Sequence, residues 1–322
     1  MNRQLALELA RVTELAAISA GRLMGKGDKI AADDAAVKAM RAMFDTVDID
    51  GTVVIGEGEM DEAPMLYIGE RVGSGKGGAV DIAVDPLEGT NLVAKGQPNA
   101  IAVLAVAPKG CLLHAPDMYM DKICVGPAGK GKISLDASVK ENLTALAEGK
   151  NCKISDLTVV ILDRPRHQDI IRDVREAGAR CKLITDGDVA PAVAAALDNT
   201  GVDMLIGKGG APEGVLAAAA LKCLGGDMQA RLVPDDDKQL ERCKSMGLKD
   251  PQMVLTLDDL VKGDDVVFAA TGITDGESLT GVRYFGGGAH THTLVMRSKT
   301  GTIRFINATH FLDKKPLIKD FF

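Results

Sequence analysis

Apolar residues recur at helical spacing in the first part of the chain. Over residues 3–23 they fall on one face at steps of three and four, which predicts an amphipathic helix. Residues 31–44 repeat this pattern and predict a second helix. Asp33 and Asp34 stand at its start, where the helix dipole favours acidic side chains.

The pattern then changes to short apolar runs, which predict strands. These runs occupy residues 52–55, 65–68, 79–84, 99–107 and 118–125. Because little helical sequence separates them, we expect a mixed or antiparallel sheet. Further strands are predicted at 265–270, 293–298 and 301–306.

From about residue 155 strands and helices alternate three times, which predicts parallel strands joined by right-handed crossovers. The strands are expected at 158–162, 181–185 and 203–206, and the helices at 167–177, 189–197 and 213–224. The polar, glycine-containing segment 127–153 precedes this alternation, so we predict a domain boundary near residue 150. Residues 1–150 would form an α+β domain and residues 151–322 an α/β domain.

Composition and charge exclude several classes of protein. The 322 residues carry 45 acidic and 38 basic side chains, a net charge of −7, and only 3% are aromatic, with no Trp. This balance disfavours a nucleic-acid-binding surface and suits sites that hold cations. The six cysteines include no pair at Cys-x-x-Cys spacing, which favours buried thiols in a reducing compartment. No secretory signal or membrane-spanning run is evident, so we expect a cytoplasmic protein that contacts no membrane.

Acidic residues between 29 and 90 carry the strongest chemical signal. Asp85 and Glu88 follow an apolar strand, Pro86 is expected to end its pairing, and Gly89 permits a close approach to a helix that starts near Thr90. Carboxylates bind hard divalent cations, and the free N–H groups of a helix start bind phosphate. This stretch therefore predicts a metal-bridged phosphate. If Asp33, Glu57 and Glu213 fold onto the same place, several ions can bind there.

Polar loops also follow each strand of the alternating segment. Arg164-Pro165-Arg166 places two guanidiniums where they can converge on one anion, or pair with neighbouring aspartates on the surface. Asp186 and Asp188 could accept hydrogen bonds from sugar hydroxyls or cap the next helix. With residues 208–213, these loops share the strand edge where open α/β sheets bind ligands, which predicts a polar, anionic ligand.

Two other motifs have plainer interpretations. Residues 73–78 contain Gly-x-Gly-x-x-Gly, but a strand follows, so we predict a hairpin and not a dinucleotide site. His290 and His292 could bind a metal from one strand face, although a structural or solvated role is the more frequent outcome for such a pair.

The sequence resembles a known enzyme family. Residues 85–90 read Asp-Pro-Leu-Glu-Gly-Thr and resemble the Asp-Pro-x-Asp-Gly-Thr signature of the metal-dependent, lithium-sensitive sugar and inositol phosphatases, with Glu88 in place of the usual Asp. Five further stretches narrow the resemblance to the bacterial class II fructose-1,6-bisphosphatases, and together the motifs span essentially the whole chain. These stretches are residues 56–66, 163–167, 184–189, 207–214 and 270–276.

The resemblance implies a layered α/β/α/β/α sandwich of the sugar phosphatase type, with metal and phosphate on the first domain and substrate on the second. The positions that match metal ligands are Asp33, Glu57, Asp85, Glu88 and Glu213. Those that match substrate contacts are Glu88, Gly89, Thr90, Tyr119, Arg164, Pro165, Arg166, Asp186, Gly187, Asp188 and Gly210. Those that match catalytic residues are Lys29, Asp61 and Thr90.

The activity implied is hydrolysis of the 1-phosphate of fructose 1,6-bisphosphate with Mn²⁺ or Mg²⁺, a step of gluconeogenesis. Thr90 would orient or deprotonate the attacking water, or attack phosphorus directly, while Lys29 and Asp61 assist. Alternatives are a phosphatase for sedoheptulose 1,7-bisphosphate or another sugar or inositol phosphate, and a metal-dependent sugar-phosphate sensor without turnover. By analogy with such enzymes we expect a homo-oligomer, taken as a homodimer.

Overall fold

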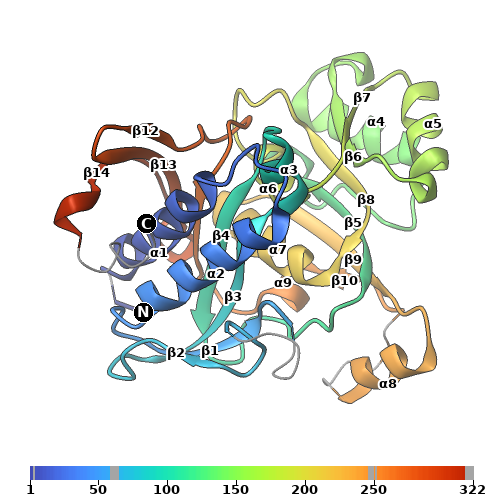
Figure 1. Ribbon diagram of the computed structural model, residues 1–322. Coiled ribbons are helices and arrows are strands. Elements are labelled where there is room, and N and C mark those ends of the chain that lie inside the picture. Colours follow the sequence, from blue (N-terminus) through green and yellow to red (C-terminus); the bar gives the residue numbers. More distant parts are fainter. Residues whose placement is uncertain (3, 59–64, 246–249, 251, 316–322) are drawn as a thin grey trace. The chain divides into compact units, whose positions relative to one another are not determined.

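The computed structural model describes residues 1–2, 4–58, 65–245, 250 and 252–315. The chain divides into two compact units (Figure 1). Unit 1 comprises Met1–Leu112 and Gly263–Phe322, and unit 2 comprises Leu113–Lys262. The predicted boundary near residue 150 falls inside unit 2, because the last strands of the chain return to the sheet that the first strands form.

Both predicted N-terminal helices are confirmed, as α1 (Leu5–Gly21) and α2 (Lys29–Phe44). The second helix begins earlier than predicted, because the Asp28 carboxylate accepts a hydrogen bond from the Ala31 N–H at 2.9 Å and caps it. Asp33 therefore lies one turn inside the helix. A short helix, α3 (Thr90–Lys95), begins at Thr90, as predicted.

Unit 1 contains an eight-stranded mixed sheet in the order β12-β13-β11-β4-β3-β1-β2, with β14 paired to β13. The strands are β1 (Asp50–Ile55), β2 (Arg71–Val72), β3 (Ala79–Glu88), β4 (Ile101–Pro108), β11 (Val267–Gly272), β12 (Arg283–Phe285), β13 (Gly288–Arg297) and β14 (Thr302–Phe311). Helices α1 and α2 pack on one face of this sheet (Figure 1). Alternate residues of the strands, such as Val53, Ile82 and Leu104, are buried in that contact.

Two local predictions in unit 1 are wrong. Residues 65–68 form no strand, and Leu66 adopts a left-handed φ of 55° that a strand cannot contain. Residues 73–78 form no hairpin, because β2 pairs antiparallel with one edge of β1 and β3 pairs parallel with the other. The loop must therefore cross the end of β1. The backbone N–H groups of Ser74 and Gly75 donate to the Val47 and Ile49 carbonyls there.

Unit 2 contains a six-stranded mixed sheet in the order β10-β9-β5-β8-β6-β7. The strands are β5 (Tyr119–Val125), β6 (Thr158–Leu162), β7 (Arg180–Ile184), β8 (Met204–Gly210), β9 (Asp227–Val233) and β10 (Leu255–Thr256). The helices are α4 (Val139–Lys150), α5 (Gln168–Glu176), α6 (Val189–Ala194), α7 (Ala211–Leu224), α8 (Asp237–Ser245) and α9 (Leu257–Leu260). The predicted alternation is confirmed, since β6 is parallel to both β7 and β8.

The helix α4 was not predicted. A capping box starts it, in which the Ser138 hydroxyl accepts from the Glu141 N–H at 3.2 Å and the Glu141 carboxylate accepts from the Ser138 N–H at 2.8 Å. Leu143 and Leu146 belong to a buried core that also contains residues of α5 and of the sheet. With two mixed sheets and their covering helices, the predicted mixed α/β class is confirmed and is consistent with an α/β sandwich.

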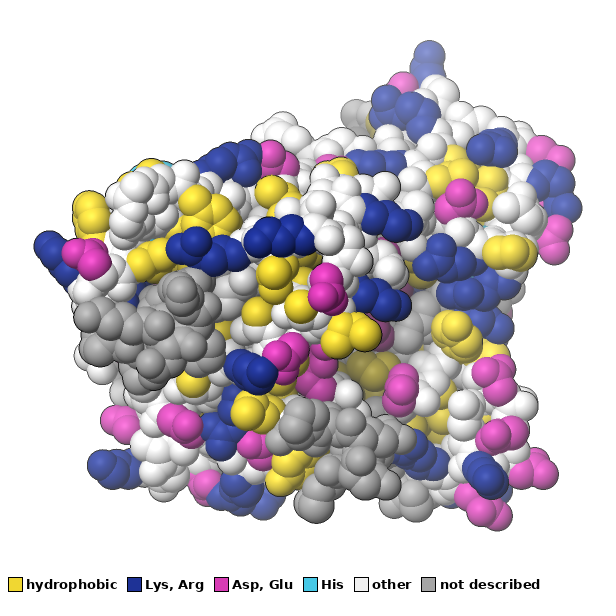
Figure 2. All heavy atoms as spheres, in the orientation of Figure 1, with side chains coloured by type: hydrophobic (Ala, Val, Ile, Leu, Met, Phe, Trp, Pro, Cys, Tyr) yellow, Lys and Arg dark blue, Asp and Glu magenta, His cyan; other side chains and the backbone are white. Residues whose placement is uncertain are grey.

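The state of the cysteines agrees with the prediction from composition. All six cysteines are free thiols, and Cys124, Cys223 and Cys243 are buried. Among the helices described, none has the length and apolar character that crossing a bilayer requires. Basic and acidic side chains are interspersed over the face that Figure 2 shows.

The buried ion pair of Asp265 and Arg297 gives a stability prediction. The guanidinium donates to both carboxylate oxygens, at 2.7 and 2.9 Å, and to the Met1 carbonyl at 2.9 Å. Removal of one partner leaves a buried charge uncompensated, so we expect Asp265→Asn to lower the free energy of unfolding by about 3 kcal/mol. Denaturant unfolding measures this change.

The exposed pair of Asp45 and Arg41 is the control, because Asp45→Asn should cost less than about 1 kcal/mol. Burial would raise the pKa of Asp265, and the Arg297 hydrogen bonds outweigh this effect and lower the pKa. The stabilisation should therefore be present at neutral pH and disappear as the pH falls below about 4, through the lowered pKa. Equal losses in both variants at pH 7 would contradict this assignment.

Candidate active site

The carboxyl ends of β1 and β3 meet at one edge of the first sheet, because the two strands are parallel neighbours. Glu57 follows β1, and Asp85 and Glu88 lie in the last part of β3. Contrary to the prediction, Pro86 does not end the strand. The pairing with β4 shifts register between Asp85 and Glu88, and such an irregularity tolerates a residue without an N–H.

Asp85 and Glu88 are close enough to bind one cation. Their ligand oxygens lie within 4.8 Å of one another. The irregular turn keeps Asp85 in place, since its Oδ1 accepts a hydrogen bond from the Leu87 N–H at 3.0 Å. Two carboxylates at this spacing are the ligand type that hard divalent cations prefer.

Glu57 and Asp33 add negative charge to the same edge of unit 1. Burial, and to a smaller extent the charge of Asp33, raise the pKa of Glu57 to about 8. Burial, followed by repulsion from Asp34, raises the pKa of Asp33 as well. Burial and neighbouring negative charge make the ionised form of these carboxyl groups unfavourable, and a bound cation would stabilise that form. The chemistry of this donor set therefore fits a metal.

Helix α3 packs beside α2. The Gly25 and Gly27 N–H groups donate to the Val93 and Ala94 carbonyls at 2.8 and 2.9 Å, which ties the segment before α2 to α3. Gly89 has a left-handed φ of 90°, and a side chain there would contact Leu92, so glycine fits this turn.

Two of the three predicted catalytic residues lie within the described part of the chain. Thr90 is the first residue of α3, and Lys29 is exposed at the start of α2. The predicted catalytic Asp61 lies outside the described residues.

In unit 2, the Arg164-Pro165-Arg166 loop follows β6. Arg164 donates to the Thr185 carbonyl at 2.6 Å, after β7, whereas Arg166 donates to the Lys208 carbonyl at 2.9 Å, on β8. Because β6 lies between β7 and β8, the two guanidiniums contact carbonyls on opposite sides of β6. The Arg166 guanidinium also lies 4.8 Å from the centre of the exposed Tyr119 ring.

His167 links two of the polar loops and was given no role from the sequence. The Lys208 N–H donates to its Nε2 at 2.8 Å, so Nδ1 carries the proton and donates to the Leu162 carbonyl at 2.7 Å. Burial lowers the pKa of His167, which favours this neutral form. The only sequence signal was its position directly after Arg166 at a strand end.

The Asp186-Gly187-Asp188 turn follows β7 and leads into α6. Gly187 has a left-handed φ of 72°. Asp188 stands at the helix N-cap, but its side chain makes no capping hydrogen bond, so Asp188 does not cap α6. Its Oδ2 instead pairs with the ammonium of Lys122 at 2.7 Å.

Gly210 and Glu213 lie where β8 leads into α7. Gly210 is the N-cap of α7, and a side chain at this position would collide with the Glu213 carboxylate. The Glu213 Oε2 is buried and accepts no hydrogen bond from the described part of the chain. Burial raises the pKa of Glu213, and the charge of Asp188 adds to this shift. Glu213 belongs to unit 2, whereas the other four predicted metal ligands belong to unit 1.

His290 and His292 have structural partners on the first sheet. His290 Nδ1 lies 3.0 Å from the Thr309 hydroxyl, and His292 Nδ1 accepts from the Thr280 N–H at 3.1 Å. These contacts support the structural interpretation of the pair over metal binding.

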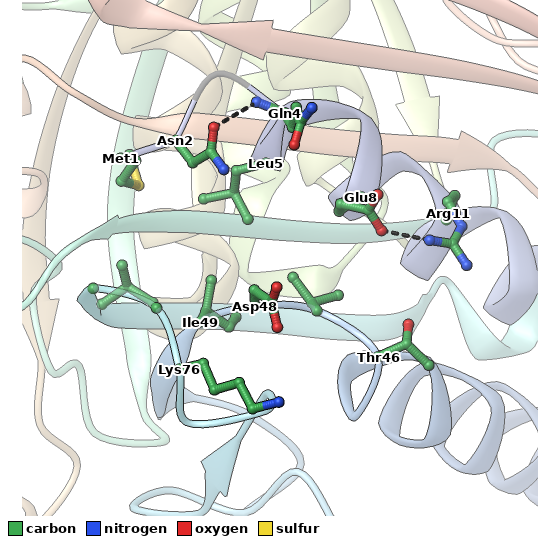
Figure 3. A pocket seen from close by; sticks show the side chains of 14 residues that line it. Met1, Asn2, Gln4, Leu5, Glu8, Arg11, Thr46, Asp48, Ile49 and Lys76 are labelled. Atoms are coloured by element: carbon green, nitrogen blue, oxygen red, sulfur yellow. Dashed lines mark hydrogen bonds and ion pairs between the residues drawn. The ribbon is translucent and has the colours of Figure 1, made fainter.

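A cavity of about 470 Å³ lies at the opposite edge of the first sheet, before β1 and β3 begin. Glu8 and Arg11 of α1 line it as a hydrogen-bonded pair, and Lys76 lines it from the loop before β3 (Figure 3). The described residues that line it include none of the predicted site residues. The predicted metal ligands and this cavity are therefore separate features.

Comparison with known proteins agrees with the sequence resemblance. A family model described as bacterial fructose-1,6-bisphosphatase, glpX-encoded, matches residues 3–310. The chain is 50% identical over 328 aligned positions to "Fructose-1,6-bisphosphatase 1 class 2" of Escherichia coli (strain K12), which covers 98% of this chain and 97% of that protein.

A second relative carries two activities in its name. "D-fructose 1,6-bisphosphatase class 2/sedoheptulose 1,7-bisphosphatase" of Synechococcus sp. (strain JA-3-3Ab) is 50% identical over 337 aligned positions, which cover 97% of each chain. These matches extend over both units described above.

The raised pKa of Glu57 predicts that its carboxylate destabilises the metal-free protein. A carboxyl group whose pKa is raised from 4.5 to about 8 stabilises the fold below pH 4.5, and this stability is lost as the pH rises through that interval. We therefore expect Glu57→Gln to raise the melting temperature at pH 8 in EDTA by a few degrees, and to flatten the decline between pH 5 and about 8.

Glu70→Gln is the contrasting control. Glu70 pairs with Arg41 at 2.5 Å and accepts a hydrogen bond from the Leu66 N–H, so its loss should lower the melting temperature. A lower melting temperature for Glu57→Gln under the same conditions would disprove the electrostatic cost assigned to Glu57.

Proposed function

Because the chain belongs to the family of glpX-encoded bacterial fructose-1,6-bisphosphatases, we propose that it hydrolyses D-fructose 1,6-bisphosphate to fructose 6-phosphate and phosphate. Family membership makes the chain a phosphoric monoester hydrolase and argues against a sensor without turnover. The observation that carries the proposal is the group of carboxylates at the β1 and β3 ends, with Asp85 beside Glu88 and Glu57 buried near Asp33, which fits a cation and, through it, a phosphate.

The metal is proposed to be Mn²⁺ or Mg²⁺, since the donors are carboxylate oxygens. The proposed ligands are Asp33, Glu57, Asp85, Glu88 and Glu213. Bound divalent cations would neutralise the phosphate charge and activate a water molecule. The adjacent Asp85 and Glu88 oxygens and the raised pKa of Glu57 support this assignment on unit 1.

The Glu88-Gly89-Thr90 turn is proposed to receive the scissile phosphate. The left-handed Gly89 lets the backbone come close to the phosphate, and Thr90 opens α3, whose first N–H groups suit an anion. The Thr90 hydroxyl would orient or deprotonate the water. Lys29, at the start of α2, would offset the negative charge of the site. Asp61 is proposed as the acid–base group.

The loops of unit 2 are proposed to bind the sugar and the distal phosphate. Arg166 and Tyr119 form a cationic and aromatic surface, and Arg164 lies on the other side of β6. Binding energy at the distal phosphate would then position the reacting phosphate. Together with the turn of unit 1 that receives the scissile phosphate, the proposed substrate-binding residues are Glu88, Gly89, Thr90, Tyr119, Arg164, Pro165, Arg166, Asp186, Gly187, Asp188 and Gly210.

Sedoheptulose 1,7-bisphosphate is proposed as a second substrate, because the Synechococcus relative carries that activity in its name. Comparison of kcat/KM for the two bisphosphates measures the preference. A homodimer and a cytoplasmic location remain predictions, which light scattering and cell fractionation would measure.

Loss of a proposed metal ligand should abolish metal-dependent phosphate release. We expect Asp33→Asn and Asp85→Asn to lower kcat by about 100-fold or more in Mn²⁺ or Mg²⁺, because each loses a charged ligand. Asp34→Asn should stay within about twofold, since Asp34 pairs with Lys38 on the exposed side of the same helix. EDTA should abolish phosphate release by the wild-type protein. Phosphate release that persists in EDTA would refute the metal assignment.

Removal of the Arg166 guanidinium should weaken binding of the distal phosphate. We expect Arg166→Gln to raise KM for fructose 1,6-bisphosphate by about tenfold or more, because a charge-assisted contact is lost. Arg172→Gln serves as the control, since Arg172 is exposed and pairs with Asp169 and Asp173. Equal KM values in the two variants would place the distal phosphate elsewhere.

A further inference from the structure

Lys122 is a buried cation in the middle of β5. Its side chain is 1% exposed, and its ammonium lies 2.7 Å from Asp188 Oδ2 and 3.0 Å from the Gly210 carbonyl oxygen. Burial alone would lower the pKa of Lys122, but the charges of Asp188 and Glu213 outweigh this effect and raise it, so the ammonium stays charged. A charged lysine occupies this core only because these partners compensate it.

The two partners of Lys122 come from different loops of the proposed substrate site. Asp188 starts α6 after β7, and Gly210 ends β8 before α7. Among the described residues of unit 2, no backbone hydrogen bond of the sheet joins these loops directly, because β6 lies between β7 and β8. The ammonium therefore connects two loops that the sheet leaves apart.

Gly209 leaves the space in which this connection forms. A methyl group at Gly209 would collide with Asp188 Oδ2 and would lie 2.9 and 3.0 Å from Cε and Nζ of Lys122. The backbone of β8 thus passes directly over the ion pair. A single added carbon at Gly209 would displace the pair while it leaves both charges present.

We propose that Lys122 is a positioning residue, whose buried ammonium holds the Asp188 carboxylate and the Gly210 carbonyl in the arrangement that binds the sugar bisphosphate. This inference rests on the proposed function. Lys122 contacts neither substrate nor reacting atoms in this scheme; it acts through the two loops. A buried ion pair is weak as a source of stability compared with apolar side chains, which accords with a role in fixing geometry.

The test is a comparison of kinetic constants for Lys122→Met, which keeps an unbranched side chain one atom shorter and removes its charge. We expect KM for fructose 1,6-bisphosphate to rise about tenfold while kcat stays within about threefold, because loop geometry and not the reacting group is altered. Lys150→Met is the matched control: it removes a partly exposed lysine of unit 2 that pairs with Asp203, and KM should stay within about twofold.

Gly209→Ala provides a second variant if Lys122→Met does not fold, and the same rise in KM is expected. Wild-type KM values in a folded Lys122→Met or Gly209→Ala enzyme would overturn the inference and leave the proposed function intact. A fall in kcat with unchanged KM would also overturn it. Absence of phosphate release from the wild-type protein would overturn the proposed function, and this inference with it.

Discussion

Parallel strand pairing is the constraint on which the proposed chemistry depends. Because β1 and β3 run in the same direction, the residues that follow each strand reach the same edge of the first sheet, and Glu57 joins Asp85 and Glu88 there. The same rule acts in unit 2, where β6, β7 and β8 bring three polar loops to one edge. Antiparallel partners would send successive loops to opposite edges.

Two groups of buried charge, one in each unit, are compensated in different ways. In unit 1, Glu57 and Asp33 repel one another and the pKa of each is raised, so the fold holds negative charge that a cation would neutralise. In unit 2, Asp188 has its own internal cation in Lys122. Carboxylates left without a counter-charge suit an exchangeable ion, and carboxylates with a fixed partner suit a rigid binding surface.

The sequence predicted the elements whose patterns are local. Helices α1 and α2, the alternation around β6 to β8 and the turn into α3 at Thr90 follow from periodicity and glycine or proline positions. Pairing partners were not predictable in this way, so the loop 73–78 was mistaken for a hairpin although β1 separates its flanking strands. The helix α4 was not predicted, because most of its residues are polar and only a few, such as Leu143 and Leu146, are apolar and buried.

Among the site residues as well, those with a local sequence signal were predictable and those that depend on distant partners were not. Asp85, Glu88 and the Arg164-Pro165-Arg166 loop are visible in the sequence because each stands at a strand end beside proline or glycine. Lys122 has no such neighbours, and its partners lie 66 and 88 positions away in the chain. Even so, a lysine inside a mostly apolar strand is informative, since a buried ammonium requires an anion from elsewhere in the fold. The motif predicts where the ligand binds, and the buried lysine predicts a counter-charge that lies far away in the sequence.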